Sequence, residues 1–364
     1  MKQAAECYVT MADGMSGMAR SSWLMDAIKA LRGVPGTKER RKELEAKLRE
    51  AQVDVFDEMQ SFSVDIDLTK LVDHSVKVVA GKTLAEAFLE IARFDRSPSR
   101  KELEEQAMNG AAGSISAIIP ATIYDNDGKV VAQSPGLSAG ANDNEQALRH
   151  LISQNEGFRR QTMAMGMIEP ARRFVSAEHP LGFVDFLPLM QMSPFVPFGH
   201  DGLYATGFAR FFSGDFVSAV HILVPQLENS LRHVLRQAAV DPSAIQNDMT
   251  QENRTLSIML DKDRASLEKI FGEAIVFEIE NLFDYRGGPS LRHQLSHGLL
   301  GTGGSRGPDA IYACWFMFRL CCLPLFRDWS EVIRVYEAVQ GIEPDQAEKG
   351  SSPEPDGQAK STDA

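Results

Sequence analysis

A short run of polar residues near the C-terminal end of the chain is its densest group of side chains able to do chemistry. The run reads Arg292-His293-Gln294-Leu295-Ser296-His297-Gly298 and lies among apolar residues. Histidine suits proton transfer because its pKa lies near neutral pH, and arginine suits a phosphate because its planar fork stays charged. In a first interpretation, His297 is the general base on an RNA 2′-hydroxyl and Arg292 stabilises the charge that develops on the phosphate, without a metal.

The same residues allow a metal-binding interpretation. His293 and His297 are four residues apart, which places both on one face of a helix, as in many zinc sites. The zinc-protease pattern His-Glu-x-x-His also needs a glutamate, and this chain has Gln294 there.

A structural interpretation stays open beside these two. A histidine that precedes a glycine, as His297 precedes Gly298, can end a helix. Arg292 can pair with the nearby carboxylates of Asp284 or Glu280.

Composition limits the kind of nucleic-acid contact. The chain has 364 residues, 43% of them apolar, and a formal net charge of −12. It is long enough for a sizeable core, but its acidic balance argues against a broad basic surface. Any RNA contact must therefore be local.

Cysteine usage and hydrophobic patterning favour a cytoplasmic protein. Cys7, Cys314, Cys321 and Cys322 are too few and too irregularly spaced for a disulfide framework or a Cys-x2-Cys metal pair. The first twenty residues lack the apolar core of a secretion signal. The most apolar stretch, Ile311–Phe326, is interrupted by charge and proline, so we expect a buried helix and no membrane span.

Hydrophobic periodicity predicts a mainly α protein, with a helical N-terminal region that carries one β-hairpin. The hairpin is expected around Asp125-Asn126-Asp127-Gly128, between β-prone runs at 116–124 and 129–133. Helices are expected over residues 23–31, 37–62, 83–94, 99–108, 145–165, 170–175, 201–212 and 215–239, twice within 264–283, over a short segment that carries 292–300, and over 309–339. We expect a kink or break at Pro225 and a bend near Pro324.

The predicted organisation has four parts: an N-terminal helical region with the hairpin over 1–140, a helical connector over 141–197, a helical domain over 198–342 and a disordered acidic tail over 343–364. The basic pairs Arg159-Arg160 and Arg172-Arg173 could touch RNA phosphate, although solvated surface is the favoured interpretation.

The region from Pro194 to Tyr336 resembles a HEPN-superfamily domain of the uncharacterised DUF4209 type. The resemblance rests on the Arg292-to-His297 spacing and on Phe198–Arg232, which includes Leu223-Val224-Pro225-Gln226-Leu227-Glu228-Asn229-Ser230-Leu231-Arg232. Many relatives have asparagines where this chain has Ser290 and His293.

The resemblance implies a HEPN-like helical bundle and an endoribonuclease that needs no metal or other cofactor. RNA would be the substrate, Arg292 and His297 the catalytic pair, and His293, Glu228 and Arg232 supporting residues. It also implies a homodimer with one motif helix from each protomer, a stress or phage-defence setting, and a neutralising partner protein. Without that resemblance, Glu228 and Arg232 predict an ordinary i,i+4 ion pair. The alternative to an enzyme is an inactive helical module that binds RNA, a nucleotide or a protein.

Overall fold

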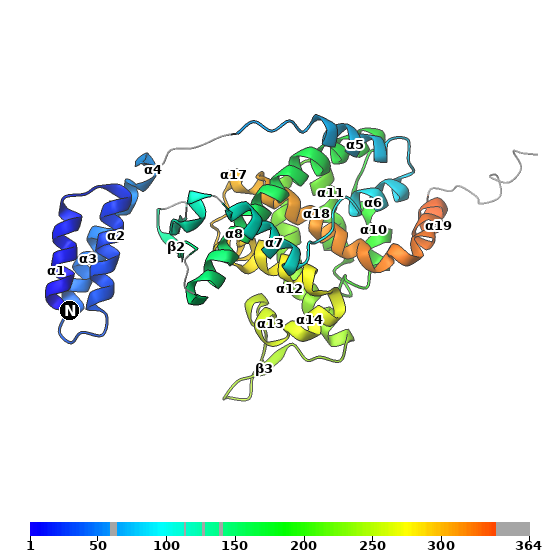
Figure 1. Ribbon diagram of the computed structural model, residues 1–364. Helices are drawn as coiled ribbons and strands as arrows, with labels where there is room; N and C mark the ends of the chain where they lie inside the picture. Colours follow the sequence, from blue (N-terminus) through cyan, green and yellow to red (C-terminus); the bar gives the residue numbers. More distant parts are fainter. Residues whose placement is uncertain (59–63, 113, 126–127, 138–140, 340–364) are drawn as a thin grey trace, which may run out of the picture. The chain divides into compact units, whose positions relative to one another are not determined.

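The computed structural model of the chain describes residues 1–58, 64–112, 114–125, 128–137 and 141–339. These residues are mainly α-helical, as predicted, and the strands among them form two small antiparallel hairpins (Figure 1). The predicted acidic tail lies outside the described residues. By contacts the chain divides into a first unit, 1–67, 97–159 and 271–293, and a second unit, 68–96, 160–270 and 294–364.

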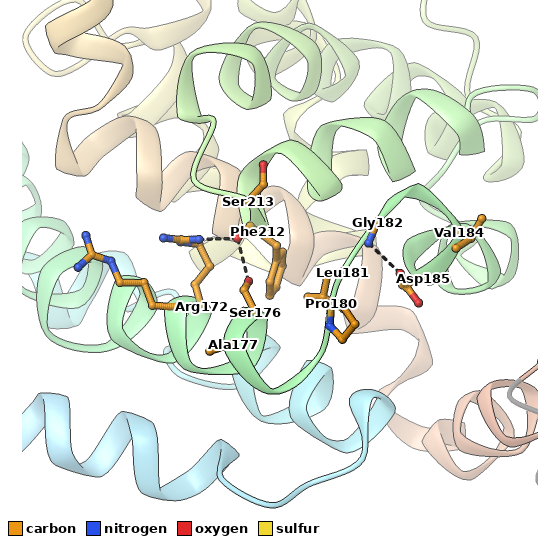
Figure 2. A pocket seen from close by; sticks show the side chains of 11 residues that line it. Arg172, Ser176, Ala177, Pro180, Leu181, Gly182, Val184, Asp185, Phe212 and Ser213 are labelled. Carbon is orange, nitrogen blue, oxygen red and sulfur yellow. Dashed lines mark hydrogen bonds between the residues drawn. The ribbon is translucent and has the colours of Figure 1, made fainter.

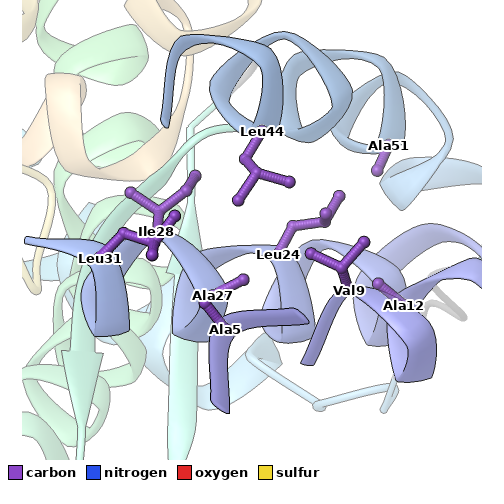
Figure 3. Close-up of a cluster of buried hydrophobic side chains, with 9 residues drawn as sticks. All are labelled: Ala5, Val9, Ala12, Leu24, Ala27, Ile28, Leu31, Leu44 and Ala51. Carbon is purple, nitrogen blue, oxygen red and sulfur yellow. The ribbon is translucent and has the colours of Figure 1, made fainter. Parts of the chain in front are cut away.

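The first unit begins with helices α1 (Lys2–Asp13), α2 (Gly17–Leu31), α3 (Lys38–Val53) and α4 (Val55–Glu58). Small and branched apolar side chains form a core between α1, α2 and α3 (Figure 3). The guanidinium of Arg40 on α3 pairs with the carboxylate of Glu6 on α1 at 2.6 Å. The long helix predicted over 37–62 is interrupted at Asp54, and its last residues are outside the described part.

The rest of the first unit contains α7 (Arg100–Ala111), η1 (Ile115–Ile118), the hairpin β1 (Ala121–Tyr124) and β2 (Val130–Ser134), most of α8 (Ala141–Met163), α15 (Glu273–Ile279) and η3 (Glu280–Asp284). Ser99 opens α7 with a capping box in which the backbone N–H of Glu102 donates to its hydroxyl. The strands β1 and β2 confirm the predicted hairpin, and the backbone N–H of Asp125 donates to the carbonyl of Lys129 at 2.8 Å. Asn126 and Asp127, at the centre of the predicted turn, lie outside the described residues.

The second unit is built around α18 (Pro308–Cys322), in which twelve of the 15 residues are buried. It also contains α5 (Thr69–Val79), α6 (Leu84–Ala92), η2 (Ala164–Ile168), α9 (Glu169–Glu178), α10 (Phe183–Met192), α11 (Asp201–Phe212), α12 (Phe216–Gln237), β3 (Ser243–Ile245), β4 (Gln251–Asn253), α13 (Leu256–Lys262), α14 (Arg264–Phe271), α17 (Thr302–Ser305), η4 (Leu323–Asp328) and α19 (Trp329–Val339). The rings of Phe88, Phe212 and Phe318 meet at centroid distances of 5.4–5.8 Å and form an aromatic core.

Helix α12 confirms the long helix predicted over 215–239. Asp215 is its N-cap, and its carboxylate accepts the backbone N–H of Ser218 at 3.1 Å. The helix continues through Pro225, so no break occurs there. The hairpin β3–β4 was not predicted: it follows α12 and pairs Ser243 with Asn253.

The helical stretch at the C-terminal end of the described chain differs from the single bent helix that was predicted. Around Pro324 the 3₁₀ turn η4 separates α18 from α19, because proline lacks the N–H that an α-helix needs. By length and composition alone, Pro308–Val339 could cross a membrane, yet 67% of its apolar window is buried in the fold, as in a core helix.

Candidate functional site

The chain approaches the Arg292 motif through a tight polar junction in the first unit. The π-helical turn η3 carries Asn281, whose side-chain oxygen accepts a hydrogen bond from the hydroxyl of Ser153 at 3.1 Å. The backbone of Gly288 passes so close to this hydrogen-bonded pair that a Cβ at position 288 would lie 2.7 Å from the Ser153 hydroxyl. Any side chain at position 288 would therefore displace the junction that leads into the motif helix. π-Helical turns occur frequently at functional sites.

Ser290 starts the motif helix from a conformation that non-glycine residues rarely adopt. Its φ is +46°, in the left-handed region, and its side chain is buried. Its hydroxyl donates to the carbonyl of Asp284 at 3.3 Å. Asparagine tolerates this region better than serine does, and asparagine is the residue that the resemblance implies at this position.

The motif helix α16 (Leu291–Ser296) ends in a Schellman motif. The backbone N–H of Leu299 donates to the carbonyl of Gln294 at 2.8 Å, and that of Gly298 donates to the carbonyl of Leu295 at 3.1 Å. Gly298 has a φ of +66°, as the C′ position of this motif requires. His297 is thus the C-cap residue, and the predicted role of the His-Gly pair in ending a helix is confirmed.

The catalytic candidates lie at opposite ends of this short helix. Arg292 is its second residue and is partly buried, like His293, whereas His297 is exposed at the C-cap. On an ideal helix, residues five apart differ by about 140° in direction, so Arg292 and His297 do not share one face. The division into two units falls inside α16, between His293 and Gln294.

The metal-binding interpretation finds little support. His293 and His297 are two potential ligands, and a stable zinc site needs at least three from the protein. In the part of the chain that the structure describes, no group of three histidine, cysteine, aspartate or glutamate side chains could hold a metal ion.

Glu228 and Arg232 form the ion pair that their i,i+4 spacing predicts. Arg232 Nη1 lies 2.7 Å from Glu228 Oε1, and both side chains are mostly buried. The other carboxylate oxygen accepts the backbone N–H of Leu256 at 3.1 Å, and Arg232 Nη1 also donates to the carbonyl of Arg254 at 3.1 Å. The pair therefore anchors the start of α13 to α12, and its predicted support of His297 stays a prediction.

Two more polar contacts hold the part of the chain that follows α12. Arg254 Nη1 lies 2.5 Å from Asp263 Oδ1, just before α14. Arg236 donates to the side-chain oxygen of Asn253 at 2.8 Å. The last turns of α12 thus hold the β3–β4 hairpin and α13 in place.

The histidines on α12 play local roles. His221 is exposed, and its Nδ1 lies 2.8 Å from the carbonyl of Val217 on the same helix. Burial, and then the positive charges of Arg236 and His200, lower the pKa of His233.

The favoured interpretation of the basic pairs as solvated surface is wrong for one member of each. Arg160 is fully buried and its Nε lies 2.8 Å from Asp309 Oδ1. Arg172 is buried and donates to Glu169 and to the carbonyl of Phe212. Arginines become buried when a partner offsets the loss of hydration, and adjacent residues on a helix point about 100° apart, so one member of each pair faces inward.

A surface cavity of about 730 Å³ lies in the second unit at the junction of α9, α10 and α11 (Figure 2). Arg172 and Ser176 on α9 point to the carbonyl of Phe212 at the end of α11, and the carboxylate of Asp185 accepts the backbone N–H of Gly182 at 2.8 Å. These polar groups already form hydrogen bonds with one another within the protein. The cavity therefore offers few groups for a ligand.

The two arginines that line this cavity are also paired with a neighbouring carboxylate. Burial would raise the pKa of Glu169, but hydrogen bonds and charge from Arg172, and then from Arg173, outweigh burial and lower the pKa. Glu169 accordingly stays ionised between two arginines, and the group is a structural ion-pair network.

Several features around the motif had no usable signal in the sequence. The π-helical turn at Glu280–Asp284 and the left-handed Ser290 are backbone conformations, which residue types alone do not specify. The burial of Arg160 depends on a helix that lies some 150 residues further along the chain. Gly298, by contrast, is a residue type that favours the left-handed conformation it adopts.

Comparisons of the chain with protein-family models, with curated proteins and with solved structures find no match. The HEPN resemblance accordingly remains a prediction from the motif residues.

Proposed function

We propose that this chain is a metal-independent endoribonuclease of HEPN type. The observation that carries the proposal is the arrangement of α16: a partly buried arginine in its first turn and an exposed histidine at a C-cap fixed by the Schellman motif. An exposed imidazole on a defined backbone can reach a substrate proton, while an arginine held by its surroundings can bind phosphate oxygens.

In the proposed reaction, His297 removes the proton from an RNA 2′-hydroxyl. The 2′-oxygen then forms a bond to phosphorus as the bond from phosphorus to the 5′-oxygen breaks. Arg292 stabilises the added negative charge on the phosphate oxygens. The 5′-oxygen takes up a proton from an imidazolium or from water, and the products are a 2′,3′-cyclic phosphate and a 5′-hydroxyl.

The angular separation on α16 supports a homodimer as the active form. Because residues five apart on an ideal helix differ by about 140° in direction, we expect one copy of the helix to present Arg292 and His297 in different directions. Two copies related by a two-fold axis can place the arginine of one protomer beside the histidine of its partner. His293 would then line the same cleft, since it lies four residues from His297 on one face.

The test is cleavage of a structured RNA by purified protein with and without EDTA. Arg292→Ala and His297→Ala should each lower the rate at least about 100-fold, the usual loss for a general base or a charge-stabilising group. His74→Ala and Arg334→Ala, which change an exposed histidine and an exposed arginine elsewhere, should leave the rate unchanged. Cleavage that survives both motif changes, or that EDTA abolishes, contradicts the proposal.

A non-catalytic binding module is the second candidate, and the net charge of −12 favours it because a cleaving enzyme must attract a polyanion. Undetectable cleavage by the wild type at several salt concentrations, together with RNA or protein binding that depends on Arg292, would select this candidate.

A further inference from the structure

Among the described residues of the second unit, Arg160 is the most deeply buried charge that lacks a full set of partners. Its side chain is 0% exposed. Nε donates to Asp309 Oδ1 at 2.8 Å, but neither Nη1 nor Nη2 has a hydrogen-bond partner among the described residues. The four N–H groups of Nη1 and Nη2 therefore meet no acceptor among the residues that the structure describes.

An unpaired guanidinium edge is costly in the interior of a protein. Arginine does not lose its proton at any physiological pH, so the charge cannot be removed by titration. Each buried donor without an acceptor destabilises the fold. The Nη1–Nη2 edge therefore requires an acceptor that the described part of the chain does not supply, and a tetrahedral oxyanion fits this edge with two parallel hydrogen bonds.

The position of Arg160 in the fold points to the same ligand. Asp309 lies in the first turn of α18, so its bond to Nε holds the guanidinium at the N-terminus of that helix. α18 has 15 residues, and its N-cap, Gly307, has no side chain to accept the first N–H groups. The positive end of a helix dipole and a buried arginine together favour an anion.

A glycine-rich segment leads into this helix. It reads Gly301-Thr302-Gly303-Gly304-Ser305-Arg306-Gly307, and all of it except Ser305 and Gly307 is exposed. A Cβ at Gly301 or Gly303 would meet nothing within 4 Å, so the backbone there is open to an approaching group. The segment begins four residues after His297 in the chain.

We propose that Arg160 and the N-terminus of α18 form a binding site for a phosphate group. The Nη1–Nη2 edge of Arg160 binds two phosphate oxygens, and the first turn of α18 faces the same group. Because Arg160 is fully covered in this structure, a neighbouring segment must move for the phosphate to enter, and we assign this movement to the glycine-rich segment Gly301–Gly307 that leads into α18. The site is independent of the cleavage chemistry proposed above.

Asp309 sets the strength of this site. Its carboxylate occupies the Nε side of the guanidinium and leaves the other edge to the ligand. Its side chain is 39% exposed, so water screens part of its repulsion of a phosphate. Removing its charge should therefore strengthen phosphate binding.

The test is thermal unfolding of the full chain in inorganic phosphate, against potassium chloride of equal ionic strength. At a phosphate concentration about ten times the dissociation constant, the melting temperature of the wild type should rise by about 3 °C. Arg160→Met should lose this rise. Asp309→Asn should show the rise at several-fold lower phosphate concentration.

Arg172→Met is the matched control, because Arg172 is also buried but all its side-chain nitrogens have partners. It should lower the melting temperature and keep the rise in phosphate. No phosphate-specific rise in the wild type would mean that ordered water fills the site, and a rise that survives Arg160→Met would also overturn the proposal. If Arg160→Met does not fold, Asp309→Asn decides: an unchanged phosphate dependence refutes the site.

Competition distinguishes the source of the phosphate. If an RNA oligonucleotide without a terminal phosphate displaces inorganic phosphate, the site binds the RNA backbone. If only a terminally phosphorylated oligonucleotide or a mononucleotide displaces it, the site binds a terminal phosphate. Either result leaves the question of cleavage by His297 to its own assay.

Discussion

The carboxylate of Glu228 accepts a hydrogen bond from the backbone N–H of Leu256, 3.1 Å away, and so caps the first turn of α13 from another helix. Thr255, the N-cap residue of α13, makes no side-chain cap of its own. The distant glutamate thus does the work that a local serine or aspartate does at other helices.

Loss of this cap should destabilise the protein. Glu228→Ala removes both the acceptor of the Leu256 N–H and the pair with Arg232, and should lower the free energy of unfolding by about 1–2 kcal/mol. Urea unfolding followed by circular dichroism measures it. Glu331→Ala, which breaks an exposed pair with Arg334, should cost under about 0.5 kcal/mol. Equal losses for the two variants would contradict the capping role.

The left-handed backbone of Ser290 predicts an unusual order of substitutions. Ser290→Asn should raise the free energy of unfolding by up to about 1 kcal/mol, because asparagine adopts this φ more readily. Ser290→Val should lower it by about 2 kcal/mol, because a β-branched side chain is strained there and loses the hydroxyl bond to Asp284. Thermal unfolding of the three proteins would test the order, and a more stable valine variant would refute it.

Gly298 should tolerate alanine poorly. At a φ of +66°, Gly298→Ala should cost about 1–2 kcal/mol and loosen the Schellman motif that fixes His297. Gly301→Ala is the matched control, since Gly301 has a φ of −74° and open space around its missing Cβ. Chemical denaturation should separate the two variants clearly. A harmless Gly298→Ala would mean that the helix end is not held as described.

Burial of His150 should make stability depend on pH. Both ring nitrogens lack a partner among the described residues, and burial lowers the pKa of His150. The unfolded chain therefore binds a proton more readily than the folded one. The stability that the folded protein gains from a neutral, buried His150 is fully present above the unfolded pKa of about 6.5. It is lost as the pH falls through the pKa of His150 in the folded state.

His150→Leu should remove that dependence, so its stability relative to wild type should improve steadily as the pH drops from about 7 to about 5. His74→Leu changes an exposed histidine and serves as the control, with no such trend expected. Urea titrations at a series of pH values measure both. A constant difference between wild type and His150→Leu would rule out the contribution.

Much of the helical framework follows from local signals. The bounds of α11 agree with the prediction because the helix is amphipathic over its whole length, and α12 begins where Asp215 supplies a cap. The β3–β4 hairpin escaped prediction because its second strand is Gln251-Glu252-Asn253, which has low strand propensity and is held by contacts to α12.

The candidate site was predictable only in part. The Schellman end of α16 follows from Gly298, which is a local signal. The burial of the Arg160 side chain depends on its hydrogen bond to Asp309, and the cap on α13 depends on Glu228, 28 residues away. Such pairings arise from tertiary packing, which no local window of sequence records.

The two tryptophans of the C-terminal helices contact segments that are synthesised much earlier, so the core of the second unit can form only late in synthesis. Trp315 donates to the carbonyl of Ile91, 224 residues earlier, and Trp329 donates to that of Ala85, 244 residues earlier. At bacterial or eukaryotic synthesis rates of about 5–20 residues per second, α6 leaves the ribosome on the order of ten to fifty seconds before these partners exist. During that interval Phe88 and its apolar neighbours have no finished core to enter. Nascent chains of this protein should therefore depend on chaperones, and C-terminal truncation should leave the early helices prone to aggregation.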